Sequence, residues 1–168
     1  MRPALWLVAA ALAGAPGPAA ADEPSGCDAF KWPLERERAA LADSKKPVVA
    51  NGGVLPFDAA ATLKLAPFAD AGLPHAPERA PKSLQSYAGH FELGPPAKAG
   101  AYKVTISSEG WIDIVDDGRF LRPRAFSGAI NCDGARKSVK FDLPPRPVDI
   151  QLSDVKTGEI SVIVSPAE

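Results

Sequence analysis

The stretch GAYKVTISSEGWIDIVDDGRFLR, residues 100–122, decides the class of fold. Apolar and polar residues alternate over 101–107 and again over 111–115, and this alternation is typical of a β-strand. Asp117-Gly118, between apolar runs, is a strong signal for a tight hairpin turn. The stretch therefore predicts three antiparallel strands that follow one another as a meander.

Similar short runs recur along the chain and are separated by turns rich in Gly and Pro. They cover residues 62–66, 87–93, 139–143, 148–152 and 159–164. Strands at this spacing are typical of sandwiches and jelly rolls. We therefore expect an all-β fold, an antiparallel and jelly-roll-like β-sandwich. The strands are expected to be half-buried, with their polar face turned outward.

The segment before the first strand carries the one short helix that the pattern predicts. Pro33 suits a first helical position, Leu34 and Leu41 form a narrow apolar stripe, and Pro47 ends the helix. We expect this helix at 33–43. The chain then divides into a signal peptide at 1–21, an arm with the helix at 22–47, and the β-sandwich at 48–168.

The first residues have the composition of a secretory signal peptide. Arg2 is followed by an apolar run at 4–13 and by the small residues Ala19-Ala20-Ala21. We expect cleavage after Ala21 and a periplasmic or secreted protein. No later segment is apolar enough to predict a membrane span.

The charge of the chain gives no reason to expect a nucleic-acid partner. It has 19 Lys and Arg against 20 Asp and Glu, for a formal charge of −1. Nucleic-acid binding depends on an excess of positive charge that this balance does not supply. We therefore expect no nucleic acid among the partners.

The chain has only two cysteines, Cys27 and Cys132. In an oxidising compartment we expect them to form one disulfide, which ties the N-terminal arm to the loop around residue 132. The alternative is a redox or metal-binding thiol. That reading lacks a Cys-x-x-Cys motif and a histidine beside either cysteine.

Aromatic and basic residues supply the candidates for ligand contact. We expect Phe30 and Trp32 to pack against one end of the sandwich, because large aromatic side chains dominate protein cores. The alternative is an exposed platform for a sugar or a partner protein. The residues that we name as candidate ligand contacts are Trp32, Trp111, Arg122 and Arg124.

Several pieces of the chain carry a resemblance. CDAFKWPLERERAAL, ATLKLAP, YAGHFELGPPAKAGAYKVTIS, WIDIVDDGR and NCDGARKSVKFDL resemble a group of short, uncharacterised secreted proteins of proteobacteria. This resemblance covers nearly all of the predicted mature chain and implies a periplasmic or secreted protein, with no activity attached. The last half is also similar, more loosely, to the bacterial pre-peptidase C-terminal β-sandwich, an accessory domain of secreted enzymes.

The two histidines, His75 and His90, are the first candidates for a metal site. Together with Glu78 or Glu92 they could hold a transition metal. Neither H-x-x-x-H nor H-x-D spacing is present, His75 lies in a Pro-rich loop, and His90 is expected on the solvent side of a strand. We therefore interpret both as structural or exposed residues.

Asp113, Asp116 and Asp117 are the second group of candidates. They could bind Ca²⁺ or act as a pair of glycosidase carboxylates. Residues 116–118 are also explained as turn residues, and Asp113 as an outward strand residue. The calcium-loop motif D-x-[DN]-x-[DN]-G is absent, so we favour the structural interpretation.

No catalytic set emerges from these patterns, and we expect no cofactor. The first hypothesis is a non-enzymatic binding or accessory module that presents the loops at 67–82 and 116–136 to a protein or a carbohydrate. The second is a small metal-dependent secreted enzyme that uses His75 and His90. The third is a structural protein of the cell envelope.

Overall fold

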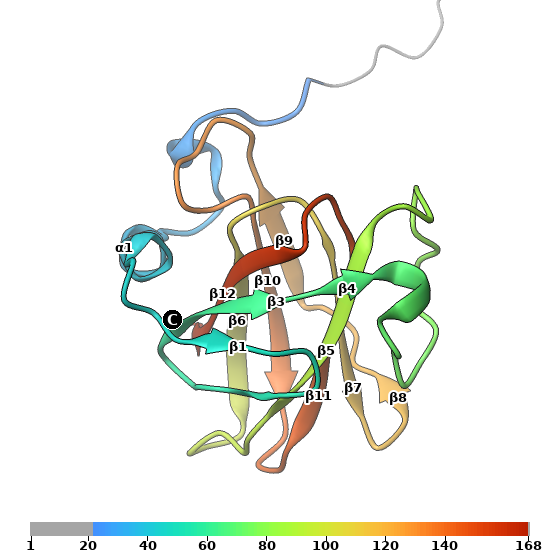
Figure 1. Ribbon diagram of the computed structural model, residues 1–168. Helices are drawn as coiled ribbons and strands as arrows, with labels where there is room; N and C mark the ends of the chain where they lie inside the picture. Colours follow the sequence, from blue (N-terminus) through green and yellow to red (C-terminus); the bar gives the residue numbers. More distant parts are fainter. Residues whose placement is uncertain (1–21, 168) are drawn as a thin grey trace, which may run out of the picture.

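A computed structural model describes residues 22–167 of the chain. The predicted signal peptide at 1–21 and its cleavage site lie outside the described residues. The described chain forms two β-sheets that pack face to face, with one short α-helix beside them (Figure 1). The prediction of an all-β sandwich with one short helix is confirmed.

The first sheet has six strands. Their spatial order is β1 (Val48–Val49), β3 (Ala60–Lys64), β12 (Glu159–Pro166), β6 (Gly100–Ile106), β10 (Lys137–Leu143) and β9 (Ala125–Gly128). The edge strand β1 pairs with β3 in parallel, and the other neighbours are antiparallel.

The second sheet also has six strands. Their order is β2 (Val54–Leu55), β5 (Tyr87–Leu93), β11 (Val148–Val155), β7 (Trp111–Asp116) and β8 (Arg119–Phe120), with β4 (Ala66–Pro67) paired to the start of β5. The edge strand β2 runs parallel to β5, and the remaining pairs are antiparallel. The predicted antiparallel sandwich therefore gains a short parallel strand at one edge of each sheet.

The strand order is that of a jelly roll. The central four strands of the first sheet are β3-β12-β6-β10, and those facing them are β5-β11-β7-β8. Most long strands that follow one another in sequence lie in opposite sheets, so the chain winds back and forth across the core as two interleaved Greek keys.

The strand order shows that the predicted three-stranded meander is wrong. Strands β6 and β7 lie in different sheets, so the turn at 107–110 carries the chain across the sandwich instead of closing a hairpin. The hairpin between β7 and β8 is confirmed, and Asp117 and Gly118 both have positive φ, 48° and 74°. The alternating pattern fixes which face of a strand is buried, but it does not specify the strand's partner, which is why the meander prediction failed.

The core lies between the sheets and contains the apolar faces that the alternation predicted. Phe91, Phe141, Ile150, Ile106 and Leu63 are almost completely buried there. Phe91 and Phe141 come from opposite sheets and are the largest of these side chains. Burial of aromatic side chains from both sheets supplies much of the stabilisation of such a core.

The outer face of the first sheet is covered, and this differs from the expected solvent-facing side. Helix α1 (Glu35–Ala42), close to the predicted 33–43, packs against β12 and β3 (Figure 1). Beneath it, Lys103 lies 3.2 Å from Glu37, and Ser165 Oγ is 2.8 Å from the same carboxylate. A buried charge needs such a partner, so the polar residues of this face are paired instead of hydrated.

The N-terminal arm starts beside the loop at 129–136, which joins β9 to β10 at one end of the sandwich, and then crosses onto this outer face. It includes the 3-10 turn η1 (Cys27–Ala29) and then Phe30, which is buried. Trp32 Nε1 donates a hydrogen bond to Ser138 Oγ of β10 (3.1 Å), and Lys140 lies over the Trp32 ring at 4.4 Å. Phe30 is therefore buried, as expected, but among Leu34, Ala129 and Ala135, whereas Trp32 is only half-buried on the outer face of β10.

The predicted disulfide is present between Cys27 and Cys132. It joins the arm to the loop at 129–136, and Figure 1 shows the two segments side by side. Backbone hydrogen bonds reinforce the junction, since Gly26 N–H donates to the Ile130 carbonyl and Ile130 N–H donates to the Pro24 carbonyl, both at 2.8 Å.

Replacing both cysteines by serine is expected to lower the free energy of unfolding by about 4 kcal/mol, since the bond closes a loop of about 100 residues. Denaturant unfolding of the wild type with and without a reductant measures this loss. Reduced wild type should match the double variant. A variant as stable as the oxidised wild type would show that the arm is held by its other contacts alone.

Candidate functional site

A long irregular segment crosses the outer face of the second sheet. This segment, residues 68–86, is named the strap; it starts with the 3-10 turn η2 (Phe68–Asp70) and ends just before β5. The side chain of Gln151 in β11 holds its middle: His75 N–H donates to Gln151 Oε1 (3.0 Å), and Gln151 Nε2 donates to the His75 carbonyl (3.1 Å).

Three further side chains fix the strap on either side of this point. Asn51 Nδ2 donates to the Ala71 carbonyl (2.8 Å). Asp113 Oδ2 accepts the Glu78 N–H (3.1 Å), and Asp154 Oδ1 accepts the Lys82 N–H (3.0 Å). The strap therefore obtains backbone hydrogen bonds from the sheet that it covers, as a loop that shields a polar surface requires.

The strap covers Asp113, which the sequence predicted as an outward strand residue of β7. Asp113 points outward from β7, but it is only 4% exposed because the strap lies over it. Trp111 Nε1 donates to Asp113 Oδ1 at 2.7 Å, so each oxygen of this carboxylate accepts an N–H group. Burial nevertheless raises the pKa of Asp113 above the ordinary aspartate value of 3.8, with the two hydrogen bonds opposing the rise.

A cleft opens where the two sheets end beside each other. It is named the edge cleft and has a volume of about 320 Å³. Its lining combines the strap, strands β7, β9 and β10, and the chain after β8. The residues are Glu78, Arg79, Trp111, Ile112, Asp113, Leu121, Pro123, Phe126, Lys137, Val139 and Phe141.

The cleft exists because β8 is too short to close the sandwich. Strand β8 pairs only with Val115 and Asp116, so β7 is an edge strand at residues 111–113. Phe126 of β9 pairs with the inward-facing Val139, which places Phe126 on the inner face of the first sheet. No strand covers it there, and its side chain is 65% exposed.

Positive side chains surround the aromatic rings at this opening. Arg79 and Lys137 lie over the Trp111 ring, with 5.3 Å and 5.7 Å from the charged groups to the ring centroid. Lys137 Nζ also donates to the Gly110 carbonyl. Burial lowers the pKa of Lys137; Glu109 opposes this effect, and the positive charges of Arg136, Arg79 and Lys82 add to it.

A second groove of about 300 Å³ continues from the edge cleft and shares Phe126 and Lys137 with it. This adjoining groove is bounded by Glu23 and Lys31 of the arm and by Arg136. Lys31 Nζ lies 5.1 Å from the centre of the Phe126 ring. The two hollows form one extended depression along the open end of the sandwich.

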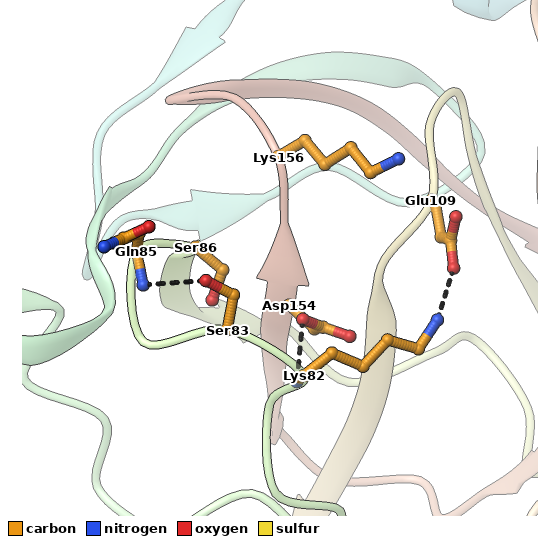
Figure 2. Close-up of a pocket in the computed structure, with 7 residues that line it drawn as sticks. All are labelled: Lys82, Ser83, Gln85, Ser86, Glu109, Asp154 and Lys156. Atoms are coloured by element: carbon orange, nitrogen blue, oxygen red, sulfur yellow. Dashed lines mark hydrogen bonds and ion pairs between the residues drawn. The ribbon is translucent and has the colours of Figure 1, made fainter.

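A third, polar hollow lies on the far side of Glu109 (Figure 2). Lys82 crosses it to bind Glu109 at 2.9 Å, and this hydrogen bond lowers the pKa of Glu109. Figure 2 shows Lys156 extending from the turn between β11 and β12 toward the same side. Its lining contains no aromatic residue, and Lys82 and Glu109 pair with each other across it, so we do not choose this hollow as the candidate site.

The two histidines do not converge. The His75 ring packs against Phe120 of β8, with ring centroids 6.2 Å apart. His90 belongs to β5, and its ring lies beside Gly52. Strands β11 and β7 separate β5 from β8. Within residues 22–167, no three side chains of His, Cys, Asp or Glu are close enough to hold a metal ion.

The three aspartates are also divided among separate tasks. Asp113 holds the strap, Asp116 accepts two hydrogen bonds from Arg146 (2.8 and 2.6 Å), and Asp117 occupies the hairpin turn. Asp113 and Asp116 point to opposite faces of β7 because their positions differ by an odd number. The arrangement supports the structural interpretation of these residues.

Of the four predicted ligand contacts, only Trp111 lines the edge cleft. Trp32 lies under Lys140 on the outer face of the first sheet, and Arg124 pairs with Asp142 at 3.0 Å. Arg122 is exposed, in the segment between β8 and β9. In the part of the chain that the structure describes, no helix has the length and apolarity of a membrane span.

Sequence reasoning did not single out Phe126 or Arg79, although the expected ligand-presenting loops at 116–136 and 67–82 contain them. Phe126 lies in a strand of only four residues, too short for a periodic pattern. The exposure of its side chain follows from the short strand β8 in the other sheet, which no local pattern encodes. Only the Pro-rich character of the strap pointed toward Arg79.

Asp113→Asn is expected to change how the free energy of unfolding depends on pH in the acidic range. A folded pKa above 3.8 means that the contribution of Asp113 is complete below the unfolded pKa and is lost as pH rises through the folded pKa. The stability of the wild type relative to the variant should therefore increase as pH falls through this window. Urea unfolding at a series of pH values measures it; a difference that shrinks on acidification would contradict the assignment.

Gln151→Leu is expected to loosen the strap, because the His75 N–H and carbonyl lose their partners, at a cost of about 1–3 kcal/mol. Limited trypsin digestion of the folded protein should then cut faster after Arg79 and Lys82. Gln85→Leu, an exposed change on the same strap, is the control. Equal cleavage rates in the two variants would show that the strap does not depend on Gln151.

No protein-family model, no curated protein and no solved structure matches this chain. The resemblance to secreted proteobacterial proteins and to the pre-peptidase domain therefore stays an expectation, and we infer function from the chemistry of the edge cleft.

Proposed function

We propose that the protein is a non-enzymatic binding or accessory module, secreted or periplasmic, whose ligand is a partner protein held at the edge cleft. The observation that carries this proposal is Phe126, an inner-face aromatic residue that is 65% exposed at the open end of the sandwich. Large aromatic residues beside a hollow are the residues on which protein interfaces most often depend.

The composition of the cleft fits recognition. Its floor is made of core side chains, Ile112, Val139 and Phe141, and its rim carries the charged residues Glu78, Arg79 and Lys137. An apolar centre with a small number of polar groups at the rim is the usual composition of binding sites. The adjoining groove lengthens this surface toward the N-terminal arm.

The polar groups of the cleft are arranged for structure more than for catalysis. A catalytic acid or base needs a free position toward a substrate. Both oxygens of Asp113 accept N–H groups of the protein itself, and the Lys137 ammonium binds a backbone carbonyl. This occupancy supports a binding role over the alternative of a metal-dependent enzyme, for which His75 and His90 provide no common site.

A secreted or periplasmic location is part of the same proposal. The Cys27–Cys132 disulfide joins the arm to the sandwich and is compatible with an oxidising compartment. The signal peptide expected at 1–21, with cleavage after Ala21, would deliver the chain there.

Carbohydrate is the second candidate ligand. Sugars bind proteins by stacking on free aromatic faces, and the faces available here are limited. Trp32 has Lys140 over its ring, and Trp111 has Arg79 and Lys137. Phe126 is more exposed, with Lys31 at 5.1 Å from its ring centroid. These contacts favour a protein partner.

Phe126→Ser is expected to abolish partner binding with little effect on stability, since the side chain is largely exposed; truncating a central aromatic contact weakens binding by about tenfold or more. The variant and the wild type, immobilised, are compared for proteins captured from periplasmic or culture extracts, and on a glycan array. Leu84→Ser, 76% exposed on the strap, is the matched control.

A partner retained by the Leu84 variant and lost by the Phe126 variant supports the edge cleft. A ligand captured equally by both variants would place the binding surface elsewhere. The third hypothesis, a structural envelope protein, predicts no ligand-dependent shift in thermal stability for any captured partner.

A further inference from the structure

One edge of β7 has no partner strand at the edge cleft, whereas its other edge pairs with β11. Alternate residues of a strand direct their N–H and C=O groups to the same neighbour. The Ile114 carbonyl faces β8, because it accepts the Leu121 N–H at 2.8 Å. Ile112 has the same orientation, but β8 pairs only as far as Val115. Its backbone groups therefore face the cleft, where another extended chain could add.

The hollow beside this edge has the size for a side chain. Its volume of about 320 Å³ lies at the lower end of the range for ligand sites. Phe126 forms one wall and the core residues Ile112, Val139 and Phe141 form the floor. An apolar side chain from an added strand would enter between the two sheets and bury this exposed surface.

Three cations around the two hollows have no carboxylate partner among the described residues. They are Lys31, Arg79 and Lys137, and each lies over an aromatic ring instead. Nearby cations such as Arg136 and Lys82 do form ion pairs, with Glu23 and Glu109. Burial lowers the pKa of Lys137, the nearby Glu109 opposes this effect, and Arg136, Arg79 and Lys82 add to it.

The carboxylates of the edge cleft do not neutralise these charges. Asp113 is buried and already accepts two N–H groups. Glu78 is exposed on the strap, and its carboxylate forms no ion pair within residues 22–167. Glu23 and Glu109 of the adjoining groove pair with Arg136 and Lys82. The lining residues that form no ion pair are therefore three cations against Glu78 and the buried Asp113, beside an apolar hollow and an unpaired edge of β7.

We propose that the edge cleft and the adjoining groove bind an extended, acidic segment of polypeptide with a bulky apolar side chain. The apolar side chain occupies the hollow beside Phe126, the peptide backbone pairs with Ile112, and flanking carboxylates meet Lys137, Arg79 and Lys31. Addition of a strand to an open sheet edge is an established mode of peptide recognition. This inference rests on the proposed binding function and names the chemistry of the partner.

A direct test uses three synthetic peptides. The first has glutamates around one central phenylalanine, the second has lysines in place of the glutamates, and the third has glycine in place of the phenylalanine. Each is titrated into ¹⁵N-labelled full-length mature protein, and the amide signals of Ile112 and Phe126 and the indole signal of Trp111 are followed by NMR.

The acidic phenylalanine peptide is expected to shift these three signals in a saturable way. Added salt should lower its affinity, because the attraction is electrostatic. The lysine and glycine peptides should bind at least about tenfold more weakly, which corresponds to the loss of one strong interaction. Equal binding of the acidic and basic peptides, or no shift at Ile112 at millimolar peptide, would overturn the proposal.

Two lysine variants distinguish binding in the edge cleft from a general attraction of the acidic peptide to positive charge on the protein. Lys137→Met is expected to lower the affinity for the acidic peptide by about tenfold, since it removes the central cation. Lys140→Met is the matched control, because Lys140 lies on the same strand and over a tryptophan ring but outside both hollows. Arg79→Met, an exposed change, gives a second reading if Lys137→Met lowers stability. Equal weakening by the Lys140 change would contradict the assigned site.

The outcome is separable from that of the proposed function. If extracts yield a partner that needs Phe126 but the acidic peptide does not bind, the binding module stands and the acidic-peptide inference fails. If the peptide binds as expected and no extract yields a partner, the recognition chemistry stands and the natural partner has to be sought in other material.

Discussion

The hydrogen bonds from Gln151 and Asp113 to the strap are the interactions on which the candidate site depends. A buried amide or carboxylate on a sheet face costs free energy unless it is paired, and backbone groups of an irregular segment have the same requirement. The strap and the outer face of the second sheet supply each other's hydrogen-bond partners. Arg79 and Glu78 reach the edge cleft only because the strap is held there by residues of β11 and β7.

Both outer faces of the sandwich are covered, by helix α1 and the arm on one side and by the strap on the other. The polar residues of each outer face are hydrogen-bonded to the segment that covers them. The open end is the exception. There the short strand β8 leaves Phe126 exposed, and three cations that form no ion pair among the described residues, Lys31, Arg79 and Lys137, lie around the two hollows.

The sequence allowed the inward faces, the hairpin at Asp117-Gly118, the helix and the disulfide to be predicted, because each depends on local periodicity, turn chemistry or cysteine count. It did not predict the partners of the strands, since a face that alternates correctly fits several neighbours. Trp111 was predicted as a ligand contact and lines the edge cleft, whereas Phe126 was predicted only as part of the loop at 116–136. The exposure of Phe126 depends on where a strand of the opposite sheet ends, and the local sequence around Phe126 does not encode that.

The position of the arm links the disulfide to the adjoining groove. Glu23 and Pro24 line this groove, and the disulfide fastens the arm a few residues later. Reduction of the disulfide would therefore loosen one wall of the groove, so the shape of the proposed binding surface would depend on an oxidising environment.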